Sequence, residues 1–346
     1  MKKLYIPEPV SLGIFLSYKC TSECKHCMYF SSPHWNEDWI SLKNAEKILV
    51  QLAGKIQGNP FGRDRIGLNT GIHFTGGEPF LNFKLLLKLT RIAHELEIPS
   101  TFVETNCFWC IDDKTTREKL LELKNAGLHG ILISVNPFIL EQIPFEKTER
   151  AVQIGKEIFG INVIIYQELF YNQFKSLNIK DSLPIEEYLL KAPDSLLYVE
   201  LLPMGRAPYA LSDLYWKYPA KRYFGGSCKA ELSRNWHNHI DNYFNYIPGY
   251  CGGISLGDAR NLDSLIKGID LEEHLILNAL VTGIKKLYEI GVDFGYKELG
   301  GGYISKCHLC FDIRKHIVER SDEFEELRPK EFYSKQKINK LCIDEF

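Results

Sequence analysis

Long apolar runs are absent from this chain of 346 residues, and none approaches the roughly 20 residues that a helix needs to cross a bilayer. A signal-peptide pattern is also missing, because Pro7 and Pro9 interrupt the N-terminal segment and the apolar stretch 12–16 is too short. Charge of one sign is not in excess: the formal net charge is −2, which gives no global argument for binding nucleic acid or an anionic membrane. We therefore expect a cytoplasmic globular protein with neither a membrane nor a nucleic-acid partner.

Short apolar runs alternate with segments of helical spacing through the first 200 residues. This alternation is typical of βαβ units and a mostly parallel sheet. Six strands are too few for a closed eight-fold barrel, so we expect an α/β fold with an open or partial barrel of six βα units. Functional residues of such folds gather where strands end. The expected strands are 12–16, 71–74, 101–104, 130–135, 163–167 and 197–202, and the expected helices are 44–55, 84–96, 117–125 and 149–159.

The pattern changes after about residue 205, where sustained periodicity stops. A hairpin is expected over 239–251, a long helix over 272–290 and a short helix over 311–319. The last 25 or so residues are highly charged and read as a helix with a loose tail. The sequence thus predicts a core domain over 1–207, a smaller cysteine-rich α+β domain over 208–320 and a tail over 321–346.

Ten cysteines are many for a cytoplasmic protein. In a reducing compartment, clustered cysteines hold metal or do redox work more often than they form disulfides. Cys20, Cys24 and Cys27 follow the first expected strand on one loop. Three thiolates without a local fourth ligand suit an iron–sulfur cluster with one open iron. The alternative is a zinc knuckle closed by His26, although His26 sits between two ligand cysteines, where tetrahedral closure is hard.

This CxxxCxxC arrangement after a first strand resembles the signature of the radical S-adenosylmethionine (SAM) superfamily. The resemblance implies a [4Fe–4S] cluster on Cys20, Cys24 and Cys27, whose open iron chelates SAM. It further implies reductive cleavage of SAM to a 5′-deoxyadenosyl radical, which abstracts a hydrogen atom from a substrate. The resemblance covers roughly residues 10–207.

Later motifs in the same segment support the resemblance. A Gly-Gly-Glu-Pro turn follows the second strand, where two glycines allow close backbone approach to a ligand, and polar residues end the third and fourth strands. A simple strand-to-helix turn and strand-end caps are the alternatives. Arg206, in the segment that resembles the end of the core, could reach a carboxylate or form a surface salt bridge. The positions that the resemblance assigns to SAM binding are Gly76, Gly77, Glu78, Pro79, Glu104, Asn106 and Ser134.

Four cysteines lie in the C-terminal region: Cys228, Cys251, Cys307 and Cys310. Their order is similar to that of SPASM/Twitch auxiliary-cluster domains, which implies a second [4Fe–4S] cluster on these four residues. Phe244 departs from the pattern, since it stands where those domains carry a glycine. Zinc on the same cysteines, or buried cysteines without a metal, are the alternatives.

Three cysteines remain outside these sets. Cys107 replaces the glycine of the family's usual Thr-Asn-Gly turn and forms a second CxxC with Cys110. A structural role, a redox pair or a contact with substrate would each fit this pair. Cys342 has no partner that the sequence identifies.

The resemblance implies a radical SAM oxidoreductase or maturase that acts on a peptide, a protein or a small metabolite. An auxiliary cluster would aid oxidation or bond formation, and an electron donor such as flavodoxin or ferredoxin would be needed. A non-catalytic iron–sulfur or zinc sensor is the alternative from another class. The Gly-Gly-Glu-Pro turn and the polar strand ends argue against a sensor, because a sensor needs no SAM site.

Overall fold

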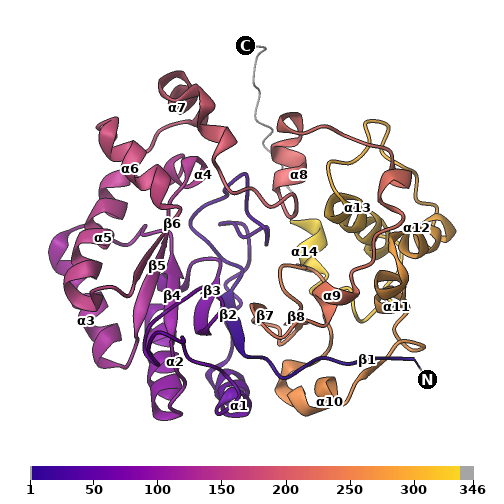
Figure 1. Cartoon of the computed structure of the whole chain (residues 1–346), viewed down its shortest axis with the longest axis horizontal. Helices are drawn as coiled ribbons and strands as arrows, with labels where there is room; N and C mark the ends of the chain where they lie inside the picture. Colours follow the sequence, from indigo (N-terminus) through magenta and orange to yellow (C-terminus); the bar gives the residue numbers. More distant parts are fainter. Residues whose placement is uncertain (1, 336–346) are drawn as a thin grey trace. The chain divides into compact units, whose positions relative to one another are not determined.

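The computed structural model in Figure 1 describes residues 2–335 of the chain. The chain divides into two compact units, which we name the sheet unit and the cysteine-rich unit. The sheet unit consists of Pro9–Cys24 and Ser31–Glu200, and the cysteine-rich unit of 2–8, Lys25–Phe30 and 201–335. The three-domain division at residues 207 and 320 stays a prediction, and Cys342 with the end of the tail lies outside the described residues.

A parallel sheet forms the centre of the sheet unit. Its strands lie in the order β6-β5-β4-β3-β2, so each strand pairs with its neighbour along the chain. All seven residues of β2 are buried, as expected for a parallel strand covered on both faces. The predicted α/β class with an open, partial barrel is therefore confirmed. The strands are β2 (Ser11–Ser17), β3 (Gly71–Gly76), β4 (Phe102–Thr105), β5 (Gly130–Ser134) and β6 (Val163–Tyr166).

Helices between the strands line the outer side of this sheet (Figure 1). Ser41, Asn82 and Asp112 each accept a backbone N–H and thereby cap α1, α2 and α3. The four predicted helices are confirmed as α1 (Leu42–Leu52), α2 (Phe83–Glu95), α3 (Asp113–Asn125) and α5 (Phe145–Phe159). Shorter elements of this unit are η1 (Pro79–Asn82), α4 (Pro137–Leu140), α6 (Glu168–Ser176), α7 (Ile185–Lys191) and η2 (Pro193–Leu197).

The predicted sixth strand over 197–202 is wrong. The sheet unit has five parallel strands, and the segment continues from η2 as irregular backbone. Leu197 and Tyr198 expose 80% and 64% of their surface, so their apolar side chains do not join the core. The backbone N–H and carbonyl of Glu200 bond to the Gln167 side chain at 3.2 and 3.4 Å, and not to the backbone of a neighbouring strand.

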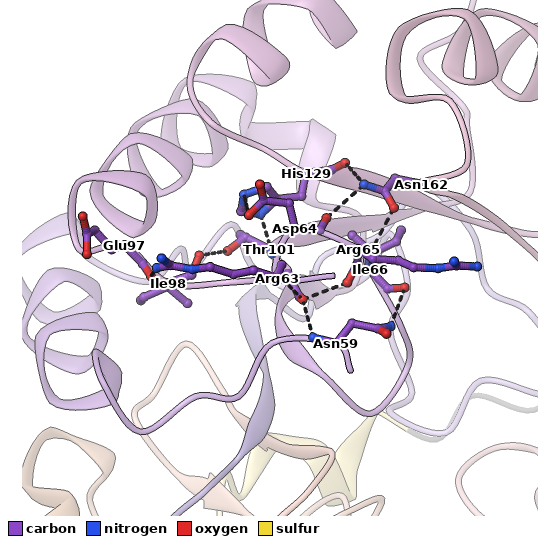
Figure 2. A network of polar contacts seen from close by, with 11 residues as sticks. Asn59, Arg63, Asp64, Arg65, Ile66, Glu97, Ile98, Thr101, His129 and Asn162 are labelled. Atoms are coloured by element: carbon purple, nitrogen blue, oxygen red, sulfur yellow. Dashed lines mark hydrogen bonds and ion pairs between the residues drawn. The ribbon is translucent and has the colours of Figure 1, made fainter. Parts of the chain in front are cut away.

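A polar network holds the amino ends of the strands together (Figure 2). The Asn162 side chain donates to the carbonyls of Asp64 (2.9 Å) and His129 (3.0 Å) and accepts from the Ile66 amide (3.3 Å). His129 Nδ1 in turn accepts from the amide of Thr101 at 2.9 Å. Because these bonds are made within the loops before β3, β4, β5 and β6, this edge is structural, and the opposite edge is where a site can form.

The cysteine-rich unit combines short strands and helices. β7 (Asn238–Ile240) and β8 (Tyr246–Ile247) form the predicted hairpin, and β1 (Lys3–Leu4) pairs antiparallel with β9 (Ile269–Asp270). Helix α12 (Ile284–Asp293) packs on both α11 (Leu275–Thr282) and α13 (Lys306–Val318). The helices of this unit are α8 (Ala207–Ala210), α9 (Lys229–Leu232), α10 (Leu262–Ile266), α11 (Leu275–Thr282), α12 (Ile284–Asp293), α13 (Lys306–Val318) and α14 (Glu331–Ser334), with single turns η3 (Ser212–Leu214), η4 (Ala220–Tyr223) and η5 (Ala259–Asn261).

Two helix predictions in this unit need correction. The helix expected over 272–290 is two helices, because Gly283 between them has φ +151° and turns the chain. The helix expected over 311–319 begins earlier, at Lys306, where the Ser305 side chain accepts from the His308 amide at 3.0 Å. As a result, Cys307 and Cys310 lie on a helix and not in the loop before it.

Within residues 2–335, no helix has the length and apolar character needed to cross a membrane.

Candidate functional site

The cysteine loop begins after β2, and Cys20 and Cys24 lie in the sheet unit. The Cys20 sulfur accepts hydrogen bonds from the Ser22 amide (3.5 Å) and from Asn106 Nδ2 (3.8 Å). Donors aimed at a sulfur favour the thiolate, which is the form that binds iron. The surroundings of Cys20 therefore fit a metal-bound cysteine.

Asn106 follows β4 and organises this loop. Besides the Cys20 sulfur, its Nδ2 group is 3.1 Å from both Thr21 Oγ1 and Ser22 Oγ, and its side-chain oxygen accepts from the Phe108 amide. The side chain of Asn106 is thus engaged with the cysteine loop, and its predicted contact with SAM stays a prediction.

The Gly-Gly-Glu-Pro turn lies directly against the start of the cysteine loop. The amides of Gly77 and Glu78 donate to the carbonyls of Ser17 (2.8 Å) and Lys19 (2.9 Å). A Cβ atom on Gly77 would lie 1.9 Å from the Lys19 carbonyl oxygen, so no other residue fits there. The two glycines are therefore required by the approach of two backbone segments, and Pro79 starts the η1 turn behind them.

The Glu78 carboxyl group points into the protein and is 1% exposed. It accepts from the amides of Phe80 (3.2 Å) and Asn106 (2.8 Å) and from the Thr105 hydroxyl (3.0 Å). Burial raises the pKa of Glu78 to about 7, and these hydrogen bonds oppose the rise. Glu78 thus ties the turn after β3 to the end of β4, while its predicted contact with SAM stays a prediction.

Thr105 is the residue that sequence reasoning missed. Its hydroxyl donates to Glu78 and accepts from the Cys107 amide and the Trp109 indole N–H, both at 3.0 Å. The Trp109 ring stacks on Phe80 with centroids 4.0 Å apart. A threonine at a strand end beside an asparagine was the available signal, but its acceptor Glu78 lies 27 residues away in the sequence.

Glu104 lies one position before Thr105 and so points to the other face of β4. It accepts from the Thr75 hydroxyl at 2.6 Å, and His73 Nε2 lies 3.7 Å from it. Burial raises the pKa of Glu104 to about 7, although the Thr75 hydrogen bond lowers it. Ser134, at the end of the neighbouring strand β5, is half-buried. These residues form a polar edge above an apolar layer, which consists of Ile66, Phe102, Leu132, Ile164 and Tyr166.

The Cys107–Cys110 pair is completely buried in the sheet unit. Cys107 has φ +66°, the left-handed conformation that favours glycine, which explains why its place matches a glycine of the related turn. Burial raises its thiol pKa well above the ordinary value. Lys147 and Arg150 donate to the carbonyls of Phe108 and Cys110 and so hold the backbone of this turn.

Cys27 and His26 belong to the cysteine-rich unit. The Arg206 amide donates to the Cys27 carbonyl at 2.9 Å, and Gly205 has φ +60°. A Cβ on Gly205 would lie 2.5 Å from both the Cys27 oxygen and the Met28 Cα, so this segment closely supports the Cys27 backbone. Burial, together with the charge of Arg206, lowers the pKa of His26 to about 4, which makes its imidazole neutral near pH 7.

The four C-terminal cysteines line a single cavity of the cysteine-rich unit. Cys228 precedes α9, Cys251 follows β8, and Cys307 and Cys310 are one turn apart on α13. The cavity measures about 50 Å³, several times the space that one water molecule needs in a protein interior. Close-packed cores leave few such spaces, so four sulfurs around a void fit a metal group.

The pKa values of the cysteine thiols at this cavity also fit a metal group. Burial, and then the neighbouring cysteines, raise the pKa of Cys228 to about 11 and that of Cys307 to about 12. Four thiols that repel one another as thiolates ionise together only around a cation, and a bound metal deprotonates them. Phe244, which departs from the related pattern, has φ +71° and so takes a backbone conformation that favours glycine.

Comparison with known proteins gives a match to a family model and matches to curated proteins. Residues 10–137 match a family model described as a 4Fe-4S single cluster domain. One of the curated relatives is the "Putative peptide biosynthesis protein YydG" of Bacillus subtilis strain 168, 27% identical over 139 residues. The match covers 40% of this chain and 38% of that protein, so the chain matches well under half of the relative's length.

The chain also matches solved structures, among them the three that follow. One is anSMEcpe with bound AdoMet, which is 14% identical; the match covers 90% of this chain and 98% of that chain, with a TM-score of 0.44. Another is BtrN in complex with AdoMet and 2-DOIA, which is 13% identical; the match covers 81% of this chain and 90% of that chain, with a TM-score of 0.41. The third is Streptococcus suis SuiB bound to precursor peptide SuiA, which is 13% identical; the match covers 70% of this chain and 59% of that chain, with a TM-score of 0.30. At TM-scores below 0.5, these likenesses identify neither a substrate nor site residues.

Proposed function

We propose that this chain is a radical SAM enzyme that oxidises or cross-links a peptide substrate. Its residues 10–137 match a family model described as a 4Fe-4S single cluster domain. When bound, the cluster and SAM together supply the 5′-deoxyadenosyl radical that abstracts a hydrogen atom. The observation that carries the proposal is the Gly-Gly-Glu-Pro turn fixed against the cysteine loop, with Gly77 and Glu78 bonded to its backbone.

The chain's own residues would hold and shape this site. We propose Cys20, Cys24 and Cys27 as the cluster ligands, and the strand-end positions Glu104 and Ser134 as contacts of SAM. The proposed SAM site is completed by Gly76, Gly77, Glu78, Pro79 and Asn106. Of these, the side chains of Glu78 and Asn106 contribute by fixing the backbone of the site. Glu104, with a pKa raised to about 7 by burial, can hold or release a proton near neutral pH.

We further propose that Cys228, Cys251, Cys307 and Cys310 hold a second [4Fe–4S] cluster. Their common cavity and the raised pKa values of Cys228 and Cys307 support a cationic metal group there. The peptide substrate is favoured over a small metabolite by the similarity to a protein named for peptide biosynthesis. A reduced flavodoxin or ferredoxin would serve as electron donor.

The test is iron and sulfide content after oxygen-free reconstitution. We expect about eight irons per chain in the parent and about four in each of two variants, Cys20/Cys24/Cys27→Ala and Cys228/Cys251/Cys307/Cys310→Ala. With dithionite and SAM, the parent should release 5′-deoxyadenosine, and the first variant should not.

The outcomes distinguish the proposal of a SAM-cleaving enzyme from the proposal of a second cluster. A reduced, fully loaded parent that does not cleave SAM would support a non-catalytic sensor instead. About four irons in the parent, with tightly bound zinc, would leave the first cluster and refute the second.

A further inference from the structure

Arg314 lies on α13 one turn after Cys310 and lines the four-cysteine cavity. It is 5% exposed, which is rare for an arginine. Its Nη1 group donates to the Tyr333 hydroxyl (2.6 Å) and the Gly252 carbonyl (3.2 Å). Its Nε–H group is buried and has no hydrogen-bond partner in the part of the chain that the structure describes.

A guanidinium buried in this way needs a negative charge nearby, since burying an unpaired charge costs several kcal/mol. Among residues 2–335, Arg314 forms no ion pair with a carboxylate; its partners are the Tyr333 hydroxyl, the Gly252 carbonyl and the Cys310 thiol. The groups that share its cavity are the thiols of Cys228, Cys251, Cys307 and Cys310. The cation is therefore compensated only when these sulfurs are ionised, which is their state around a metal group.

We propose that Arg314 is the fixed counter-charge of the second iron–sulfur site and raises its reduction potential, so that the site accepts an electron. This inference rests on the proposed second cluster. Adding one electron adds one negative charge inside an apolar cavity, and a buried cation beside it favours that reduced form. The unpartnered Nε–H group supplies a donor for a sulfur, which acts in the same direction.

Lys306 is the second cation of this cavity and offers a comparison. Its ammonium group donates to the Ser227 carbonyl at 2.9 Å and is half-buried. Water screens a half-exposed charge more than a buried one. We therefore assign Arg314 the larger effect on the potential.

The experiment measures the midpoint potential of the second site by redox titration followed by electron paramagnetic resonance. It uses the full chain with Cys20/Cys24/Cys27→Ala, so that the signal comes from the second site alone. Arg314→Met should lower the reduction constant at least tenfold, a shift of about 59 mV for one electron. Lys306→Met should shift it less, in the same direction.

Tyr333→Phe is the matched control, because it removes the hydrogen-bond partner of Arg314 and keeps the charge. The potential should stay near that of the parent. Arg314→Gln, which keeps a donor for Gly252 but has no charge, repeats the comparison if the Met variant does not take up iron.

Full iron content with an unchanged potential in Arg314→Met or Arg314→Gln would overturn the inference, as would an equal shift in Tyr333→Phe. Absence of iron from the Cys20/Cys24/Cys27→Ala parent, with zinc in its place, would instead refute the second cluster itself.

Discussion

Replacing Thr105 by valine tests whether its hydroxyl holds the site together. The change keeps the side-chain shape and removes a donor to Glu78 and an acceptor for the Cys107 amide and the Trp109 indole N–H. Each buried group left without a partner costs about 1–3 kcal/mol. Because the groups are neighbours and their effects are not additive, we expect a total loss of about 3–5 kcal/mol.

The assay is thermal unfolding at matched iron content, followed by circular dichroism and by tryptophan fluorescence. A loss of this size lowers Tm by on the order of 10 °C in a unit of this length. Thr90→Val is the control, since the Thr90 hydroxyl is equally buried but makes one hydrogen bond, to the Leu86 carbonyl at 2.9 Å. A fall in Tm no larger for Thr105→Val than for Thr90→Val would refute the reasoning.

Three further predictions concern single positions. Burial raises the pKa of Glu104 to about 7 in the folded chain, against 4.5 in the unfolded chain. The stability that the protonated carboxyl group contributes is therefore complete below about pH 4.5 and is lost as the pH rises through 7. Glu104→Gln should be more stable than the parent by up to about 3 kcal/mol at pH 8 and equally stable at pH 4.5, and equal urea midpoints at pH 8 would contradict this. Gly205→Ala should lose about four irons, because the added Cβ displaces Cys27. Gly160→Ala is the control and should keep its iron, since Gly160 has a similar φ of +61° and no atom within 4 Å of the added Cβ. Equal iron content in the two variants would show that the close approach of Gly205 to the Cys27 backbone is unimportant. Cys107→Gly should be more stable than Cys107→Ala by about 1 kcal/mol, because glycine relieves the left-handed backbone, and urea unfolding that gives the usual opposite order would disprove it.

Local patterns predicted most of the sheet unit. The apolar runs of β2, β3, β4, β5 and β6 and the helical spacing between them are properties of short segments, and each lies where it was expected. The failure at 197–202 has a physical reason, since that segment has the composition of a strand without a neighbour that pairs with it.

Helix boundaries in the cysteine-rich unit depended on single residues. Gly283 divides the expected long helix, and the Ser305 cap starts α13 one residue before Cys307. The predicted helix began at residue 311, so Cys307 and Cys310 were expected in the loop before it and not on the helix. Their position on the helix brings Arg314, four residues after Cys310, to the same cavity as the cysteines.

The candidate site was predictable by residue type and less so by role. The sequence placed Glu78 and Asn106 near a ligand because both follow strands. In the structure their side chains bond to Thr105 and to the cysteine loop. Such partners are distant in sequence, so a single chain does not reveal them before it is folded.

The charges around the proposed second cluster favour the uptake of an electron there. Around the four C-terminal cysteines, Arg314 and Lys306 supply positive charge. Positive surroundings raise a reduction potential, so we expect the proposed second cluster to take an electron from a substrate.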